Sequence, residues 1–150
     1  MTIKIVKSQY ADTSAPSGAV NKDVLLANSK LHISDVSAAM RWMANQLEIA
    51  GDLHDWTKIK FIDEFYRDFE DNRKNENWFK SIHLQERHHL TDRCPDDVNL
   101  FDVLERIADI TMAGMARSGK TYDDDLSPAL LTRAYKNTIE LLKKNIEVVE

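Results

Sequence analysis

Apolar residues recur at helical spacing along most of the chain. The first clear pattern is a face whose members are separated by three, one, three and four residues: Val36, Ala39, Met40, Met43 and Leu47. We expect this helix to begin near Asn28 or Ser29, either of which can cap it, and to end at Gly51. His32 lies four residues before the first member, so its imidazole is predicted to point inward.

The same periodicity predicts further helices towards the C-terminus. In the second, an acid shares the apolar stripe: Asp55, Ile59, Ile62, Tyr66 and Phe69. A polar connection over residues 68–77 precedes a third helix, which is expected from about Trp78 to Leu90 and carries three histidines. Asp96 or Asp97 is expected to cap a fourth, with the apolar face Leu100, Leu104, Ile107 and Thr111.

The last helix is expected to start at Ser127-Pro128, with Ser as N-cap and Pro in the first turn. Its face is Leu131, Tyr135, Thr138, Leu142 and Ile146. About five helices and little else predict an all-α fold, a compact helical bundle. Only 4 glycines and 3 prolines among 150 residues also favour helices over a turn-rich β fold.

The N-terminus does not follow the helical pattern. Residues 1–23 are expected to form an irregular arm, in which Thr2–Val6 alternates like a short strand and Ser14–Gly18 is turn material. The remaining residues, 24–150, are expected to form a single helical domain, since a chain of this length can bury one core.

Composition narrows the classes of partner. The net charge is −5 and no basic tract is present, which argues against duplex nucleic acid. No apolar run is long enough to span a membrane, and the first residues lack the apolar core of a signal peptide. The single cysteine, Cys94, cannot form an intrachain disulfide, which fits the cytoplasm. The small size makes a homodimer a plausible assembly.

The chemistry of the chain is concentrated around His54-Asp55. Imidazole and carboxylate together suit Mn, Fe, Co, Ni or Zn, and an Asp beside a ligating His can bridge two metals. Asp109 lies in an apolar run, where a carboxylate is costly unless it is paired or holds a metal. With His32, and with His83 and His88, these residues predict one site for one or two divalent ions. The alternative is a helical bundle whose histidines are hydrogen-bonded core residues.

This order of residues resembles the HD-domain superfamily of metal-dependent phosphohydrolases. That family has a first His, a His-Asp dyad and a final Asp, matched here by His32, 22 residues before His54, by His54-Asp55 and by Asp109. Its dyad is often followed by Gly-Lys; here Lys58 matches the Lys and the Gly is missing. The likeness covers residues 28–117 and is closest to small members from phage and bacterial genomes.

The resemblance implies both a ligand set and a reaction. His32, His54, Asp55 and Asp109 would hold a first metal. Asp55 would bridge to a second, held by His83 and by His88 or His89. On one straight helix, however, His83 and His88 would lie about 140° apart. The implied reaction is attack of metal-activated water on the phosphorus of a nucleotide or another small phosphoester.

The resemblance also suggests roles for polar residues around the ligands. Besides Asp55, the catalytic candidates are Lys58, which could neutralise phosphate charge, and Glu64, a general acid or base. The candidates for substrate contact are His89, Arg87, Arg117 and Lys120. The alternative function is a non-catalytic module of the same fold that binds a nucleotide or a protein.

Residues 114–121, GMARSGKT, satisfy the phosphate-loop pattern letter for letter. That loop must follow a strand and open a helix, whereas a helix is expected before it here. Three acids, Asp123 to Asp125, also follow where phosphate would bind. We therefore interpret this stretch as a helix C-terminus with Gly119 as its stop.

Overall fold

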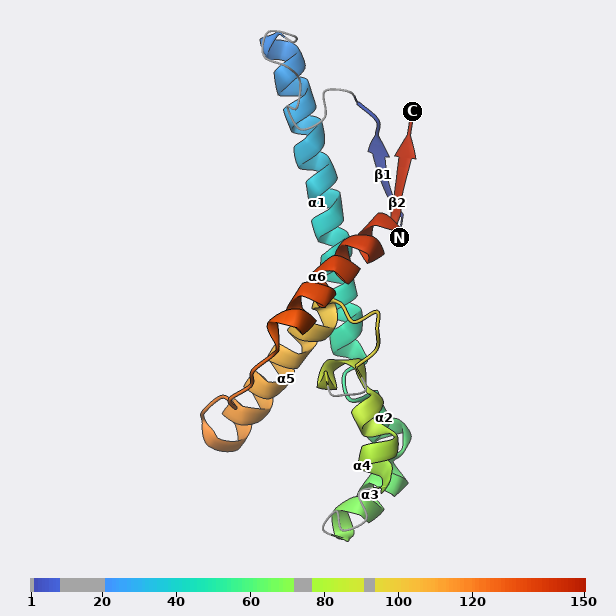
Figure 1. Ribbon diagram of the computed structural model, residues 1–150, viewed down its shortest axis with the longest axis vertical. Coiled ribbons are helices and arrows are strands. Elements are labelled where there is room, and N and C mark those ends of the chain that lie inside the picture. The colour runs from blue at the N-terminus through green and yellow to red at the C-terminus, as the bar shows by residue number, and fades with distance from the viewer. Residues whose placement is uncertain (1, 9–20, 72–76, 91–93) are drawn as a thin grey trace. The chain divides into compact units, whose positions relative to one another are not determined.

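The computed structural model describes residues 2–8, 21–71, 77–90 and 94–150, and these are mostly helical (Figure 1). The all-α prediction is therefore confirmed. The α-helices are α1 (Lys22–Asp52), α2 (Trp56–Lys60), α3 (Ile62–Glu70), α4 (Asn77–Ser81), α5 (Leu100–Ser118) and α6 (Pro128–Lys143). Two 3₁₀ turns, η2 (His83–Gln85) and η3 (Arg87–His89), follow α4, and the strands are β1 (Ile3–Val6) and β2 (Ile146–Val149).

Contacts divide the chain into two compact units, which differs from the expected boundary at residue 24. One unit comprises Met1–Gln46 with Glu140–Glu150, and the other comprises Leu47–Ile139. In the first, β1 and β2 pair in parallel, with Ile3 opposite Ile146 and Val6 opposite Val149. The short strand within residues 2–6 is confirmed, whereas the Ser14–Gly18 turn lies outside the described residues.

Ile146 was expected on the last helix and lies instead in β2. The segment Ile146–Val149 is rich in β-branched residues, which favour strands, and β1 supplies its backbone partners. The expected start of α6 is confirmed, since Leu130 N donates to Ser127 Oγ at 3.2 Å.

The ends of α1 differ from expectation. The helix begins at Lys22 rather than near residue 28, because the side chain of Asn21 accepts a hydrogen bond from Val24 N at 3.0 Å. It also continues through Gly51 to Asp52, so Gly51 is helical rather than a stop. Val36 and Met40, on the face expected to be buried, are 47% and 60% exposed.

The expected second helix is two elements, α2 and α3, which meet at Phe61. At this break the backbone N–H of Phe61 donates to Thr57 O, and the φ and ψ angles of Phe61, −115° and 42°, are not helical. The break interrupts the predicted stripe, and its members Ile59, Ile62, Tyr66 and Phe69 are exposed rather than buried.

Helix α5 is capped by Asn99, not by the two aspartates expected. The Asn99 side chain accepts from Phe101 N at 2.9 Å, and Asp102 Oδ2 accepts from Asn99 N at 2.8 Å, which is a capping box. At its other end Gly119 adopts a left-handed φ of 70°, as expected for a stop. The helical segment before Gly119 is inconsistent with a phosphate loop.

The second unit contains most of the buried side chains described. Val98, Phe101 and Val103 are buried where α5 begins, and Ala134 and Thr138 are buried on α6. Thr138 Oγ1 accepts from Leu100 N at 2.8 Å, which ties α6 to the start of α5. This fixes the first turns of α5, from which the acids discussed next project.

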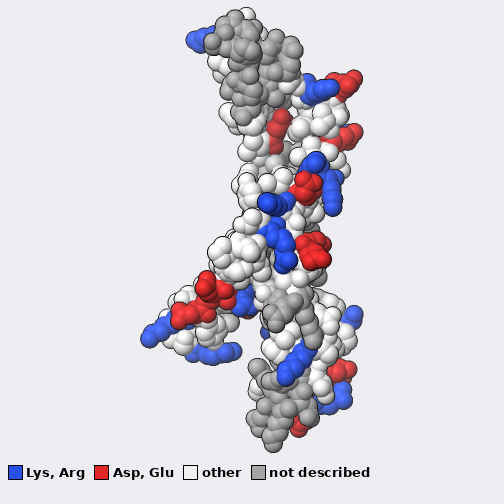
Figure 2. Space-filling model, viewed as in Figure 1, with Lys and Arg blue, Asp and Glu red and all other residues white. Residues whose placement is uncertain are grey.

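Acidic and basic side chains are interspersed on the face shown in Figure 2. Among the described residues, no helix combines the length and the apolar character needed to cross a bilayer.

Candidate metal centre

The His-Asp dyad lies in the turn between α1 and α2. Asp55 adopts a left-handed conformation there, with a φ of 55°. Such a backbone costs on the order of 1 kcal/mol outside glycine, and Asp tolerates it better than most residues. The turn directs His54 and Asp55 towards α5 and the histidine segment at residues 83–89.

The two carboxylate oxygens of Asp55 face different histidines. Oδ2 lies 3.6 Å from His54 Nε2, whereas Oδ1 lies 3.6 Å from His83 Nε2 and 3.8 Å from His88 Nε2. The Lys58 ammonium donates a hydrogen bond to Oδ2. Burial alone would raise the pKa of Asp55, but Lys58, together with His54 and His83, lowers that pKa.

Glu105 holds two of these histidines through one oxygen. Its Oε1 lies 3.0 Å from His54 Nδ1 and 3.0 Å from His88 Nδ1. If both rings donate from Nδ1, both Nε2 atoms carry lone pairs, which is the form in which imidazole binds metal. Burial would raise the pKa of Glu105, but its bonds to His88 and His54 lower it.

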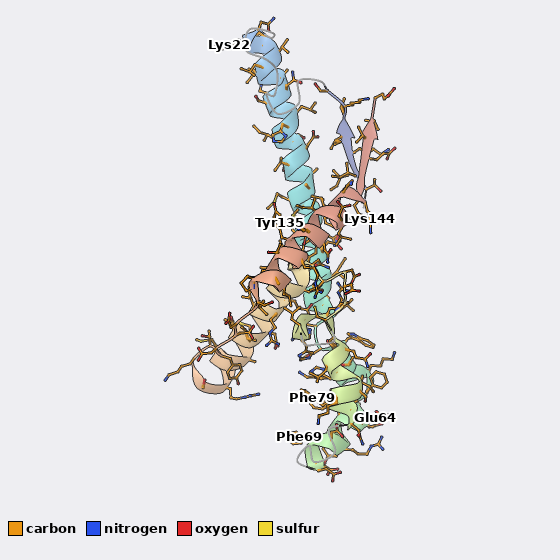
Figure 3. All side chains as sticks on the ribbon, viewed as in Figure 1. Lys22, Glu64, Phe69, Phe79, Tyr135 and Lys144 are labelled. Atoms are coloured by element: carbon orange, nitrogen blue, oxygen red, sulfur yellow. The ribbon has the colours of Figure 1, made fainter. Side chains whose placement is uncertain are left out.

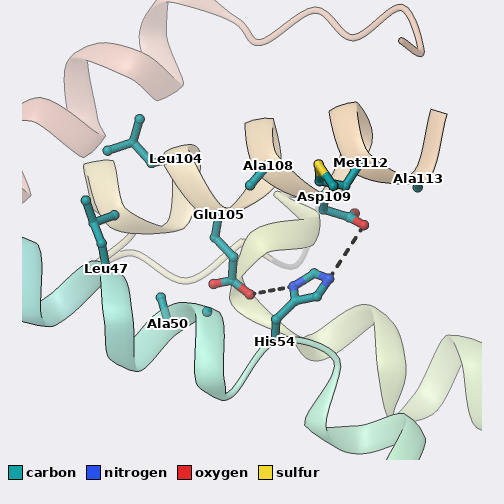
Figure 4. A pocket seen from close by; sticks show the side chains of 10 residues that line it. Leu47, Ala50, His54, Leu104, Glu105, Ala108, Asp109, Met112 and Ala113 are labelled. Atoms are coloured by element: carbon teal, nitrogen blue, oxygen red, sulfur yellow. Dashed lines mark hydrogen bonds and ion pairs between the residues drawn. The ribbon is translucent and has the colours of Figure 1, made fainter. Parts of the chain in front are cut away.

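Asp109 follows Glu105 by four residues and therefore lies on the same face of α5. Its Oδ1 is 3.6 Å from His54 Nε2, the nitrogen that also faces Asp55 (Figure 4). Arg106, three residues before Asp109 in the sequence, bonds to Asp124 at 2.9 and 3.1 Å.

Glu86 supports the opposite side of the cluster. It accepts hydrogen bonds from the backbone N–H of Thr57 at 3.1 Å and from the Thr57 hydroxyl. Thr57 Oγ1 also lies 3.0 Å from His83 Nδ1, and the His83 ring stacks on Trp78 at 5.0 Å. Burial, followed by the charge of Lys58, lowers the pKa of His83. The His83 ring is thus fixed with Nε2 towards Asp55.

The prediction of one helix over residues 78–90 is wrong. Helix α4 ends at Ser81, and the extended backbone of Glu86, with a ψ of 136°, separates η2 from η3. The 140° separation of His83 and His88 therefore does not arise. His89 also joins the cluster, with Nε2 at 3.1 Å from His83 Nε2.

Burial and the neighbouring His88 and His83 lower the pKa of His89 to about 3. This histidine is therefore neutral at pH 7. Its backbone carbonyl accepts from Arg106 at 3.3 Å, which ties η3 to α5.

The cluster suits a divalent metal on three grounds. Ligands about 2.1 Å from a shared ion lie about 3.0–3.5 Å apart, and the separations from Asp55 to His54, His83 and His88 are only slightly longer. His88 is 1% exposed, and its Nε2 has no hydrogen-bond partner among the described residues. In addition, the described carboxylates of Asp55, Glu86, Glu105 and Asp109 all lie beside these histidines.

Three sets of described side chains place their ligand atoms within 4.8 Å of one another. They are His54, His88 and Asp109; Asp55, His88 and His89; and Asp55, His83 and Glu86. Five of the six predicted metal ligands therefore come together. His32 belongs to the first unit, on α1, and its role as a ligand stays a prediction.

Other predicted site residues have different surroundings. Glu64 lies exposed on α3 (labelled in Figure 3), with Arg67 3.8 Å away. Arg87 is held by Asp102 at 2.7 and 2.8 Å and by Asp97 at 2.9 Å, which raises its pKa. The structure therefore gives Glu64 and Arg87 partners of their own, outside the groups that could hold a metal.

The two basic residues near the end of α5 are also outside these groups. Arg117 is exposed and lies over the Tyr122 ring at 5.8 Å, and Lys120 is exposed beyond the helix end. Their predicted contact with substrate stays a prediction.

Sequence reasoning missed Glu86, Glu105 and Thr57. A signal for Glu105 was present, since it precedes Asp109 by four residues and shares its helical face. Glu86 adjoins the histidines in sequence, but its role depends on the break between η2 and η3.

Comparison with protein-family models, curated proteins and solved structures finds no match.

Proposed function

We propose that this protein is a metal-dependent phosphohydrolase that acts on a nucleotide or another small phosphoester. The observation that carries the proposal is the position of Asp55, whose Oδ2 faces His54 while its Oδ1 faces His83 and His88. A carboxylate in this position can be shared by two ions. Two adjacent divalent ions activate water and stabilise the charge of a transferring phosphoryl group.

The chain's own residues have definite tasks in this proposal. Glu105 keeps His54 and His88 in the tautomer that presents Nε2, and Glu86 with Thr57 orients His83. Lys58 bonds to Asp55 and can turn from it to a substrate phosphate. The choice of phosphoesters rests on Lys58 and on the resemblance to the HD-domain superfamily.

The test is hydrolysis of a panel of nucleotides and simple phosphate esters with added Mn²⁺, Co²⁺ or Ni²⁺. We expect activity that chelator abolishes and that Asp55→Ala lowers by at least about 100-fold. Asp63→Ala, at an exposed acid on α3, is the matched control and should be fully active. Wild-type protein that binds none of the added metals and is as inert as Asp55→Ala on every ester would overturn the proposal.

One observation favours a second candidate, a non-catalytic binding module. The Lys58 ammonium already compensates Asp55, as it would where a side chain takes the place of a metal. This candidate predicts nucleotide binding without turnover and without an effect of chelator. A Lys58→Met variant separates the two, because it should weaken ligand binding in the module but strengthen metal binding in the enzyme.

We also propose that the protein is cytoplasmic, which its single cysteine supports. In addition, we propose that it forms a homodimer. Apolar side chains exposed on α2 and α3 support a second copy as partner: Ile59, Ile62, Tyr66 and Phe69. Sedimentation of the purified protein tests the assembly.

A further inference from the structure

An open apolar cleft adjoins the candidate metal centre, within the second unit of the chain. Its volume is about 480 Å³, which is ample for one aromatic ring with its substituents. One side is formed by the end of α1, where Leu47, Ala50 and Gly51 lie on one helical face. The opposite side is formed by Leu104, Ala108, Met112 and Ala113 of α5 (Figure 4).

The polar groups of the cleft are confined to the part next to the centre. Among its lining side chains, those with hydrogen-bonding atoms are His54, Glu105 and Asp109. The two acids bond or face His54, at 3.0 and 3.6 Å. The remaining lining side chains are aliphatic or methionine, apart from one glycine, and they have no groups that could read the polar edge of a nucleobase.

We propose that this cleft binds the apolar group of the phosphoester, an aromatic ring or alkyl chain, while the phosphate lies at the metal centre. This inference rests on the proposed function and makes it more specific, because the aliphatic part of the lining, away from the metal centre, has no hydrogen-bonding groups and selects hydrophobic alcohols over polar ones. The small side chains of Ala50, Ala108 and Ala113 leave room for a flat ring.

Binding of non-hydrolysable phosphonates tests the cleft separately from turnover. Phenylphosphonate and methylphosphonate present the same anion and differ in the apolar group. Burial of the ring should make phenylphosphonate bind about 10- to 100-fold more tightly to the Zn²⁺-loaded protein. Titrations followed by calorimetry give the ratio. Methyl NMR signals of Leu47, Leu104 and Met112 should shift when phenylphosphonate is added but not when methylphosphonate is added.

Ala108→Leu should fill the cleft and bring the ratio of the two affinities to near one. Ala108 is exposed, and Leu is a good helix former, so the variant should fold. Ala116→Leu is the matched control: it is exposed on the same helix, lies outside the cleft, and should keep the wild-type ratio.

The outcomes separate this inference from the proposed function. Equal affinities for the two phosphonates, both requiring Zn²⁺, would overturn the cleft assignment and leave the metal centre standing. A preference for phenylphosphonate that persists without metal would support the cleft and count against the metal centre. Failure of both to bind would overturn the cleft assignment. So would methyl signals that shift with protein concentration, because a second copy would then cover the cleft.

Discussion

Removal of the Glu105 carboxylate should weaken metal binding through two ligands, His54 and His88. Its Oε1 holds His54 and His88 at 3.0 Å each, and these two histidines face different oxygens of Asp55. Loss of such an outer partner typically costs about 10- to 100-fold in metal affinity, which corresponds to about 1.4–2.7 kcal/mol. We expect Glu105→Ala to show this loss for every metal bound.

Calorimetric titration of Zn²⁺ into the metal-free protein measures the effect. Glu105→Gln keeps an oxygen that can accept from one histidine or both but removes the charge, so its loss of affinity should be smaller. Glu64→Ala, at an exposed glutamate, is the control and should bind Zn²⁺ like wild type. Circular dichroism establishes that each variant is helical.

The reasoning is refuted if Glu105→Ala, correctly folded, binds Zn²⁺ as tightly as Glu64→Ala. The histidines would then be oriented without Glu105, and the 3.0 Å contacts would be ordinary polar packing.

Two further predictions concern the metal-free fold. The pKa of His89, about 3, lies below the usual value of about 6.5, so the unfolded chain binds a proton between these values. The contribution of neutral His89 to the free energy of unfolding is present above pH 6.5 and is lost as pH falls towards 3. Between about pH 3 and pH 6.5, His89→Gln should therefore reduce the slope of the unfolding free energy against pH by up to about 1.4 kcal/mol per pH unit. Unfolding free energies from urea titrations that depend on pH in the same way for wild type and variant would contradict this. Gly114→Ala should destabilise by about 1–3 kcal/mol, since its Cβ would lie 2.5 Å from the Lys120 carbonyl oxygen. Gly51→Ala, with open space around it, should be neutral or stabilising, and equal melting temperatures of the two variants would refute the argument.

Sequence reasoning was most successful where the signal was local. Helical spacing predicted the all-α fold, Ser127 predicted the start of α6, and Gly119 predicted the end of α5. It failed where distant contacts decide the outcome. Ile146 fits a helical face, but pairing with β1 makes it part of a strand.

The candidate site shows the same division. Asp109 was found because a carboxylate in an apolar run stands out in the sequence, and His54 and Asp55 because an adjacent His-Asp pair suits a divalent metal. Their supports, Glu86 and Glu105, were missed, because a glutamate in a helical pattern is usually a surface residue. For Glu105 alone, the four-residue spacing from Asp109 was a usable signal. The extended backbone at Glu86 gathers the histidines, and no periodicity in the sequence marks it.

The most direct test of the metal centre is the metal content of the purified protein after dialysis against Mn²⁺. We predict one or two Mn²⁺ per chain for wild type and for Asp63→Ala, and loss of Mn²⁺ in Asp55→Ala, since His54, His83 and His88 all face that carboxylate. Wild-type protein that retains no Mn²⁺, or Asp55→Ala that retains as much as wild type, would contradict the account.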